Sequence, residues 1–195
     1  MARLDPLNRA DLPQLAEALD QIEADHGYIP NSFLTLARDP TLLAAQHALA
    51  QALWYGQRIA PEVRQLVAFG FSLYNGAMYS AAHTAAPGAD TPLPIEQLRA
   101  VRDAETSPVY SAQQRALLRL CRAAARVPSE VKDEHVAALR TWFDDQQLVQ
   151  IVGLIAWHAF LNTWNGIWNT RLEDQPRAFA QASLAGSGWH GQAHQ

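Results

Sequence analysis

Apolar residues recur along most of this chain at the three- and four-residue spacing of amphipathic helices. The strict alternation of apolar and polar positions that marks a half-buried strand is absent from the sequence. Proline, glycine and aspartate interrupt the apolar stretches where helices would begin and end. The pattern therefore predicts an all-α protein.

The boundaries of the expected helices come from start and stop signals. Gly27 and Gly56 follow apolar stretches as helix stops, and Pro40 and Pro61 precede others as first-turn residues. The segment GYIPNSF after the first helix is expected to be a turn. The expected helices cover about residues 11–26, 40–56, 61–75, 77–86, 95–103, 111–127, 132–143 and 144–170.

These helices are expected to form one all-α domain over residues 1–182. The last residues, 183–195, read SLAGSGWHGQAHQ and are small and polar, so we expect them to form a flexible tail. A division into two helical halves near Ser107 and Pro108 is the alternative.

Composition excludes some classes of partner. The formal net charge is -4 and Lys132 is the only lysine, so no concentrated basic surface exists for nucleic acid. No stretch approaches the length of an uninterrupted apolar membrane span, and the N-terminus lacks the apolar run of a signal peptide. We expect a soluble cytoplasmic protein that binds neither nucleic acid nor membrane.

The only cysteine, Cys121, lies among apolar residues at helical spacing and is expected to be a buried core thiol. One cysteine excludes a disulfide framework or a cysteine metal site. The sequence also has no phosphate-binding glycine loop and no cluster of metal ligands, so we expect no metal and no cofactor.

Four sequence features occur in the order typical of one family. They are Ile-Pro-Asn at 29–31, an Arg-x-Leu-Val helix at 64–67, Asn-Gly-x-x-Tyr-x-x-x-His at 75–83 and Asp-x-x-Leu-Val at 145–149. Together they resemble the carboxymuconolactone decarboxylase and alkylhydroperoxidase D-like superfamily over about residues 28–172. The resemblance implies an all-α helical bundle and a homo-oligomer, either a dimer, a trimer or a hexamer.

The resemblance also locates a site in which every redox residue has changed. Peroxidase members carry a Glu, a Cys-x-x-Cys pair and a following His, and these positions fall on Gln65, Ala77, Ser80 and Thr84, with His83 adjacent to the last. Either His83 or Thr84 could occupy the position of the family histidine. Peroxide reduction needs a thiolate and a resolving thiol, which alanine and serine cannot replace. We therefore expect no cysteine-dependent peroxidase activity.

Hydroxyl groups and one imidazole remain on this helix. Residues four apart share a helix face, so Tyr79 lies beside His83, and Ser80 beside Thr84. His83 is the candidate for proton transfer because imidazole titrates near neutral pH. The alternative is a histidine hydrogen-bonded within the helical core. A Ser80 and His83 hydrolase pair is not favoured, because the sequence around Ser80 lacks a nucleophile elbow.

The last long helix carries a polar stripe, formed by His158, Asn162, Asn165 and Asn169. Buried polar groups require partners, so the stripe lines a wet pocket, an internal hydrogen-bond network or a subunit interface. Trp54, at the end of the second helix, lies near the pocket entrance in related proteins. Its alternative role is simple helix packing.

Two functional interpretations follow. In the first, the protein is a thiol-independent acid–base enzyme acting on a small organic acid or lactone. Its catalytic residues would be His83, Tyr79 and Ser80, and its substrate-binding residues would be Gln65, Thr84, His158, Asn162 and Trp54. In the second, it is a catalytically inactive oligomeric binding or scaffold protein of the same fold. The loss of the family carboxylate at Gln65 weakens the first interpretation.

Overall fold

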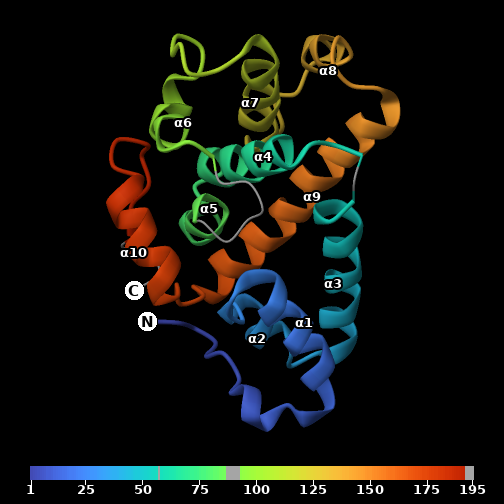
Figure 1. The fold of residues 1–195 in the computed structure, drawn as a ribbon, viewed down its shortest axis with the longest axis vertical. Helices are drawn as coiled ribbons and strands as arrows, with labels where there is room; N and C mark the ends of the chain where they lie inside the picture. Colours follow the sequence, from blue (N-terminus) through green and yellow to red (C-terminus); the bar gives the residue numbers. More distant parts are fainter. Residues whose placement is uncertain (57, 87–92, 192–195) are drawn as a thin grey trace.

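The computed structural model describes residues 1–56, 58–86 and 93–191, which form helices and no strand (Figure 1). The expectation of an all-α fold is therefore confirmed. The α-helices are α1 (Ala16–His26), α2 (Asn31–Leu36), α3 (Pro40–Trp54), α4 (Pro61–Tyr74), α5 (Met78–Ala85), α6 (Ile95–Ala100), α7 (Ala112–Ala124), α8 (Asp133–Leu139), α9 (Asp145–Trp168) and α10 (Asp174–Ser183).

Local capping explains why the long helices begin where the sequence predicts. Asp39 accepts hydrogen bonds from the first backbone amides of α3. Ser111 and Asp144 begin α7 and α9, each in a reciprocal capping box with the glutamine three residues later. The first helix is shorter than expected, because two 3-10 turns precede Ala16.

Two helices differ from the expectation. The sequence predicts a turn over residues 27–33, but α2 begins at Asn31, directly after the extended Pro30. The sequence pattern assigns no helix to α10, which begins after Glu173 with Asp174 in its first turn. The helix expected over residues 77–86 corresponds to α5, which ends at Ala85, and the Pro87-Gly88 turn expected to follow it lies outside the described residues.

Part of the predicted tail packs against the rest of the molecule. Leu184 and Ser187 are buried, and the Trp189 indole N–H donates to the Met78 carbonyl oxygen over 2.9 Å. Residues 192–195 lie outside the described part of the chain. The division between a domain and a tail at residue 182 stays a prediction.

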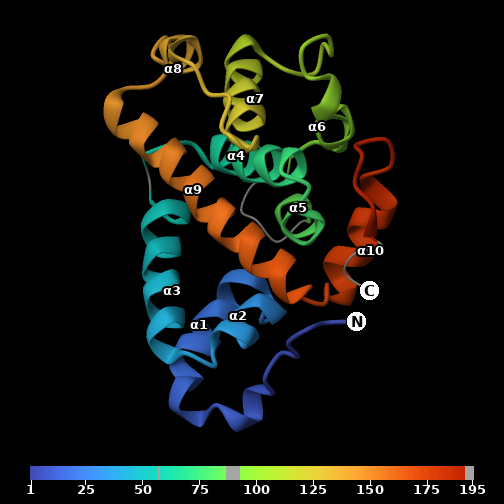
Figure 2. The ribbon, with the colours of Figure 1, turned by 180° about the vertical axis from the view of Figure 1, so that it is seen from behind.

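Helix α4 forms the centre of the fold. All of its residues from Arg64 to Leu73 are buried, and it packs against α5, α7 and α9. The longest helix, α9, crosses the molecule diagonally, from the end near α8 to the end near α10, as both Figure 1 and Figure 2 show. No helix in the described ranges is long and apolar enough to cross a membrane.

The buried side chains form two clusters. The larger joins α4, α5, α7 and α9, and the smaller joins α1, α2 and the start of α3 around Leu19, Ile22 and Phe33. Side chains from both clusters line one cavity, and the candidate site lies at this junction.

Candidate active site

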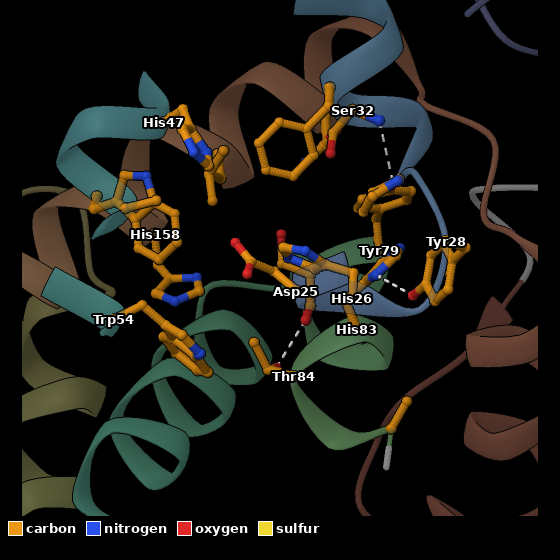
Figure 3. A pocket seen from close by; sticks show the side chains of 18 of the residues that line it. Asp25, His26, Tyr28, Ser32, His47, Trp54, Tyr79, His83, Thr84 and His158 are labelled. Carbon is orange, nitrogen blue, oxygen red and sulfur yellow. Dashed lines mark hydrogen bonds between the residues drawn. The ribbon is translucent and has the colours of Figure 1, made fainter. Parts of the chain in front are cut away.

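A cavity of about 140 Å³ lies between the two hydrophobic clusters. Its wall is built from α1, α2, α3, α4, α5, α9 and α10, and aromatic and imidazole rings face it from several sides (Figure 3). Among the sequence-predicted site residues, the wall includes Trp54, Gln65, Tyr79, Ser80, His83, Thr84 and His158. Residues that lie far apart in the sequence are thus brought together around one pocket.

Helix α5 supplies most of the predicted catalytic residues. Gly76 adopts a left-handed backbone with φ of 76°, and the Ala77 amide donates to the Ser72 carbonyl oxygen, so the chain turns back from α4 and begins α5 at once. Tyr79 and His83 lie on the same face of α5, with ring centres 4.4 Å apart. The sequence-predicted pairing of these two residues is therefore confirmed.

Glu173, the residue before α10, places a carboxylate beside His83 and Tyr79. Its Oε2 lies 2.7 Å from His83 Nε2, and its Oε1 accepts from the Tyr79 hydroxyl over 2.9 Å. The Asn31 backbone amide also donates to Oε1. Glu173 therefore joins α5, α10 and the start of α2.

Burial opposes ionisation of Glu173, but the His83 ring and the surrounding N–H donors outweigh it and hold the pKa of this carboxyl below its ordinary value. Glu173 is consequently a carboxylate near neutral pH and only accepts hydrogen bonds. In the neutral imidazole, His83 Nε2 then carries the hydrogen and donates to Glu173, which leaves Nδ1 as an acceptor.

Tyr28 completes the chain of hydrogen bonds. Its hydroxyl lies 2.9 Å from His83 Nδ1 and donates to it (Figure 3). Burial, with a smaller contribution from Glu173, raises the pKa of Tyr28 above its ordinary value, so the phenol keeps its proton. The site therefore contains a continuous relay, Tyr28 to His83 to Glu173, with Tyr28 in the pocket wall.

His158 lies on another wall of the pocket, between two tryptophans. Its ring centre is 6.1 Å from that of Trp54 and 4.8 Å from that of Trp157. Burial lowers the pKa of His158 to about 3, so the ring is neutral near neutral pH. Neither ring nitrogen has a hydrogen-bond partner among the described residues.

Two further predicted residues, Gln65 and Thr84, use their side chains to hydrogen-bond backbone carbonyl groups. Thr84 Oγ1 donates to the Ser80 carbonyl oxygen over 2.7 Å, and Gln65 Nε2 donates to the Thr84 carbonyl oxygen. Ser80 and Thr84 are both buried in the pocket wall. The imidazole of His83, in contrast, contacts functional groups from other elements, so it is the better candidate for chemistry of the pair His83 and Thr84.

The polar stripe on α9 divides between two environments. His158 faces the pocket, and Asn165 lines both the pocket and a separate small cavity beside Ala77. Asn162 lies at that small cavity, where it accepts from Ser72 over 3.4 Å and donates to Asn75 over 3.3 Å. Asn169 is not in the helix, because it caps α9 in a left-handed conformation. Asn162 therefore lies in an internal hydrogen-bond network, one of the three alternatives for the stripe.

Sequence reasoning missed Tyr28, Glu173 and three further residues of the pocket wall, Asp25, His26 and His47. His47 is half-buried and lines the pocket. The pKa of His26 is lowered, mainly by burial. Tyr28 directly precedes the Ile-Pro-Asn feature, and this position could have identified it as a candidate site residue. No sequence feature next to Glu173 indicated a role in the site.

The sole cysteine lies in the core and not in the pocket. Cys121 is fully buried, its Sγ lies 3.7 Å from the Val67 carbonyl oxygen, and burial raises the pKa of its thiol to about 12. Within the described ranges, no group of three or more His, Cys, Asp or Glu side chains could hold a metal ion.

Similar folds occur among solved structures. The debrominase Bmp8, as a cysteine-to-alanine variant in complex with 2,3,4-tribromopyrrole, matches with a TM-score of 0.83 and 28% identity over 92% of this chain and 96% of that chain. An alkylhydroperoxidase D core protein from Ralstonia eutropha JMP134, described as peroxidase-related, matches with a TM-score of 0.73 and 22% identity over 90% of this chain and 94% of that chain. A peroxidase-related protein from Silicibacter sp. TM1040 matches with a TM-score of 0.65 and 20% identity over 98% of this chain and 95% of that chain.

No family model matches the sequence, and neither does any curated protein. The assignment therefore depends on the shared three-dimensional arrangement and on the order of the sequence features. The absence of a Cys-x-x-Cys pair agrees with the single cysteine of the chain. On this basis the chain has the fold of alkylhydroperoxidase D-like proteins, and its sequence contains no Cys-x-x-Cys pair.

Proposed function

We propose that the protein is a thiol-independent enzyme that moves a proton to or from a small, uncharged organic molecule, such as a lactone. The observation that carries this proposal is the hydrogen-bonded relay from Tyr28 through His83 to Glu173, which opens on a pocket. The relay supplies the acid–base groups and the carboxylate that such chemistry needs, although the family positions for the thiols are Ala77 and Ser80.

The relay can work in both directions. As a base, Tyr28 passes its proton to His83 Nδ1 while it takes a proton from the substrate, so the substrate loses one proton and the imidazole gains one. As an acid, the imidazolium returns that proton through Tyr28. Glu173 stabilises the imidazolium in either direction. The raised pKa of Tyr28 disfavours a phenolate, so the proton taken from the substrate ends on His83.

Charge and size favour a neutral ligand over a carboxylate. Among the described residues, no lysine or arginine lines the pocket, whereas Asp25 does and Glu173 lies next to it. This supports the lactone class more strongly than the organic-acid class. The debrominase, which is 28% identical to this chain, forms a complex with a single-ring compound, and a ligand of that size is consistent with the cavity.

Exchange of substrate protons with solvent tests the proposal whatever product the reaction forms. Unsaturated five-membered lactones and azoles would be incubated with the protein in D₂O, and deuterium incorporation would be followed by ¹H NMR. We expect exchange with the wild type and a loss of about 100-fold or more in Tyr28→Phe and His83→Gln. Tyr74→Phe is the matched control, because the Tyr74 hydroxyl donates to the Val101 carbonyl oxygen outside the pocket.

The second interpretation, an inactive scaffold, predicts no exchange with any compound of the panel. A scaffold has no need for an open cavity, and apolar side chains would fill it, whereas here the cavity persists between His83 and His158. Equal exchange rates in the wild type and Tyr28→Phe would also contradict the relay.

We also infer that the chain forms a homo-oligomer through α9. An apolar stripe on the outer side of this helix, made of Val149, Val152, Ala156, Phe160 and Ile167, is exposed. Exposed apolar stripes of this kind mark interaction surfaces.

A further inference from the structure

The imidazole of His158 lies in the pocket wall between two tryptophans, Trp54 and Trp157. The side chain is 4% exposed and projects into the pocket beside Trp54 (Figure 3). Neither Nδ1 nor Nε2 contacts a hydrogen-bond partner among the described residues. Folded proteins rarely leave a buried polar group without a partner, because its lost hydration is not replaced.

A second group without a partner faces the same pocket. Asn165 is buried two turns further along α9, and its Oδ1 also has no hydrogen-bond partner within the described ranges. Asn165 also lines the small cavity beside Ala77, whereas His158 lines the main pocket and not that cavity. The unpaired nitrogens of His158 therefore point to a polar ligand or to bound water in the main pocket.

The charge state of His158 limits the chemistry of this partner. Burial keeps the ring neutral, so it offers one N–H donor and one nitrogen acceptor. A hydroxyl, a ring N–H or a carbonyl can pair with these atoms. A carboxylate would gain no ion pair there, because no lysine or arginine lines the described part of the pocket.

The size of the pocket limits the ligand further. A cavity of about 150 Å³ holds one benzene molecule in another protein, and the cavity here measures about 140 Å³. Trp54 and Trp157 flank His158 and provide the apolar contacts that a planar ring requires. One ring with a polar substituent therefore fits.

We propose that His158 is a ligand-recognition residue, which hydrogen-bonds a hydroxyl, ring N–H or carbonyl group of an uncharged single-ring ligand. In Figure 3 His158 lies on the opposite side of the pocket from Tyr28. The proposal deepens the proposed function, on which it rests, because it assumes that the same pocket takes the substrate. It assigns recognition to His158 and proton transfer to His83.

Binding of three probes to the full chain tests this assignment. Phenol, toluene and benzoate have similar size and differ in the substituent, and their affinities can be measured by ligand-observed NMR. We expect phenol to bind about tenfold more tightly than toluene, and benzoate to bind more weakly than both. In ¹⁵N-histidine spectra, phenol should shift the His158 ring nitrogens and toluene should not.

Two variants separate hydrogen bonding from folding. His158→Leu removes both hydrogen-bonding atoms and should abolish the preference for phenol over toluene while toluene still binds. His158→Gln retains a donor and an acceptor and should restore part of the preference. His135→Leu is the control, because His135 is only partly buried and lies on α8, away from the pocket.

Each contrary result has a distinct meaning. A preference for phenol that survives in His158→Leu, or unshifted His158 nitrogens in the presence of bound phenol, would overturn the recognition role and leave the relay intact. If only water hydrogen-bonds to His158, the His158 nitrogens would stay unshifted when phenol binds. Failure of every probe to bind would overturn the inference together with the small-molecule pocket, whereas probe binding without deuterium exchange would overturn only the acid–base activity.

Discussion

At the scale of single residues, Glu173 connects three separate segments of the site. Its carboxylate accepts hydrogen bonds from the His83 ring, the Tyr79 hydroxyl and the Asn31 amide. These donors can be satisfied together only while Glu173 is ionised. The residue therefore couples the protonation of the site to the stability of the fold.

Replacement of Glu173 by glutamine should destabilise the protein by about 1–3 kcal/mol near neutral pH, because the amide cannot accept from His83 while it satisfies both other donors. The pKa of Glu173 is lowered in the folded state, so its contribution is present above the ordinary carboxyl range and is lost as pH falls through it. Urea denaturation of wild type and variant should show a difference that shrinks on acidification.

The control for this prediction is Glu105→Gln. Glu105 pairs with Arg119 on the surface, where both side chains are about half exposed, so its loss should cost at most about 1 kcal/mol. A Glu173→Gln protein as stable as the wild type would show that the network is not formed in solution.

His158 makes a separate prediction about pH. The pKa of His158 falls from 6.5 to about 3 on folding. Between these two pH values the imidazole is protonated in the unfolded chain and neutral in the folded chain. The free energy of unfolding should therefore decrease on acidification across this window, by up to about 1.4 kcal/mol per pH unit. Chemical denaturation of His158→Gln over the same range should show a flatter dependence, and parallel curves would contradict the burial of this ring.

At the scale of elements, the turn between α9 and α10 brings Glu173 back to α5. Asn169 ends α9 with φ of 48°, and its side-chain amide donates to the Met1 carbonyl oxygen over 3.0 Å. This left-handed residue lets the chain reverse direction within a few residues. The position of the carboxylate thus depends on one backbone conformation that few side chains adopt.

Asn169→Val should destabilise the protein by about 1–3 kcal/mol, because a β-branched residue is strained in the left-handed region. Asn169→Gly loses the same hydrogen bond to Met1 but has no strain, so it is the matched control. Thermal unfolding of the two variants should separate the backbone effect from the lost contact. Equal stability of the two variants would refute the expected backbone strain at residue 169.

Sequence reasoning succeeded for the elements that have strong local signals. Helices α3, α4, α7 and α9 follow proline or capping residues and carry long apolar stretches, so the sequence predicts their ranges closely. Helix α2 has only six residues, too few to show a periodic pattern. Helix α10 has an acidic start at Glu173 and Asp174 that could have been recognised.

The contacts of the site were likewise predictable only where they depend on local sequence. Tyr79 and His83 are predictable as a pair because helical spacing alone places them together. The contacts of His83 with Tyr28 and Glu173 join residues 55 and 90 positions apart, and only the tertiary fold determines such distances. This is why the sequence alone, with Gln65 at the family position, indicates that the carboxylate is missing.

At the scale of the whole molecule, the exposed stripe on α9 bears on assembly. Val152 is 51% exposed and Ile167 is 57% exposed, and Leu49 on the neighbouring helix α3 is exposed as well. The opposite face of α9 lines the pocket with His158 and Asn165. A partner bound to the stripe would therefore contact the helix that forms the pocket wall.

Val152→Glu should convert the proposed homo-oligomer to a monomer, because a buried charge at an interface costs several kcal/mol. Light scattering coupled to size-exclusion chromatography would measure the mass of both proteins. Val127→Glu is the control, since Val127 is 97% exposed after α7, away from the stripe, and should leave the mass unchanged. A wild type that is already monomeric would remove the basis for this interface.

The buried thiol of Cys121 provides a natural probe of unfolding. Cys121 is the only cysteine, and it is buried on α7 against α4. Its raised pKa leaves almost no thiolate at neutral pH. A thiol-reactive dye can therefore label the native chain only when the central helices separate. The labelling rate would report the opening of the core directly, without an engineered probe, and would distinguish a local loss at the pocket from collapse of the whole bundle.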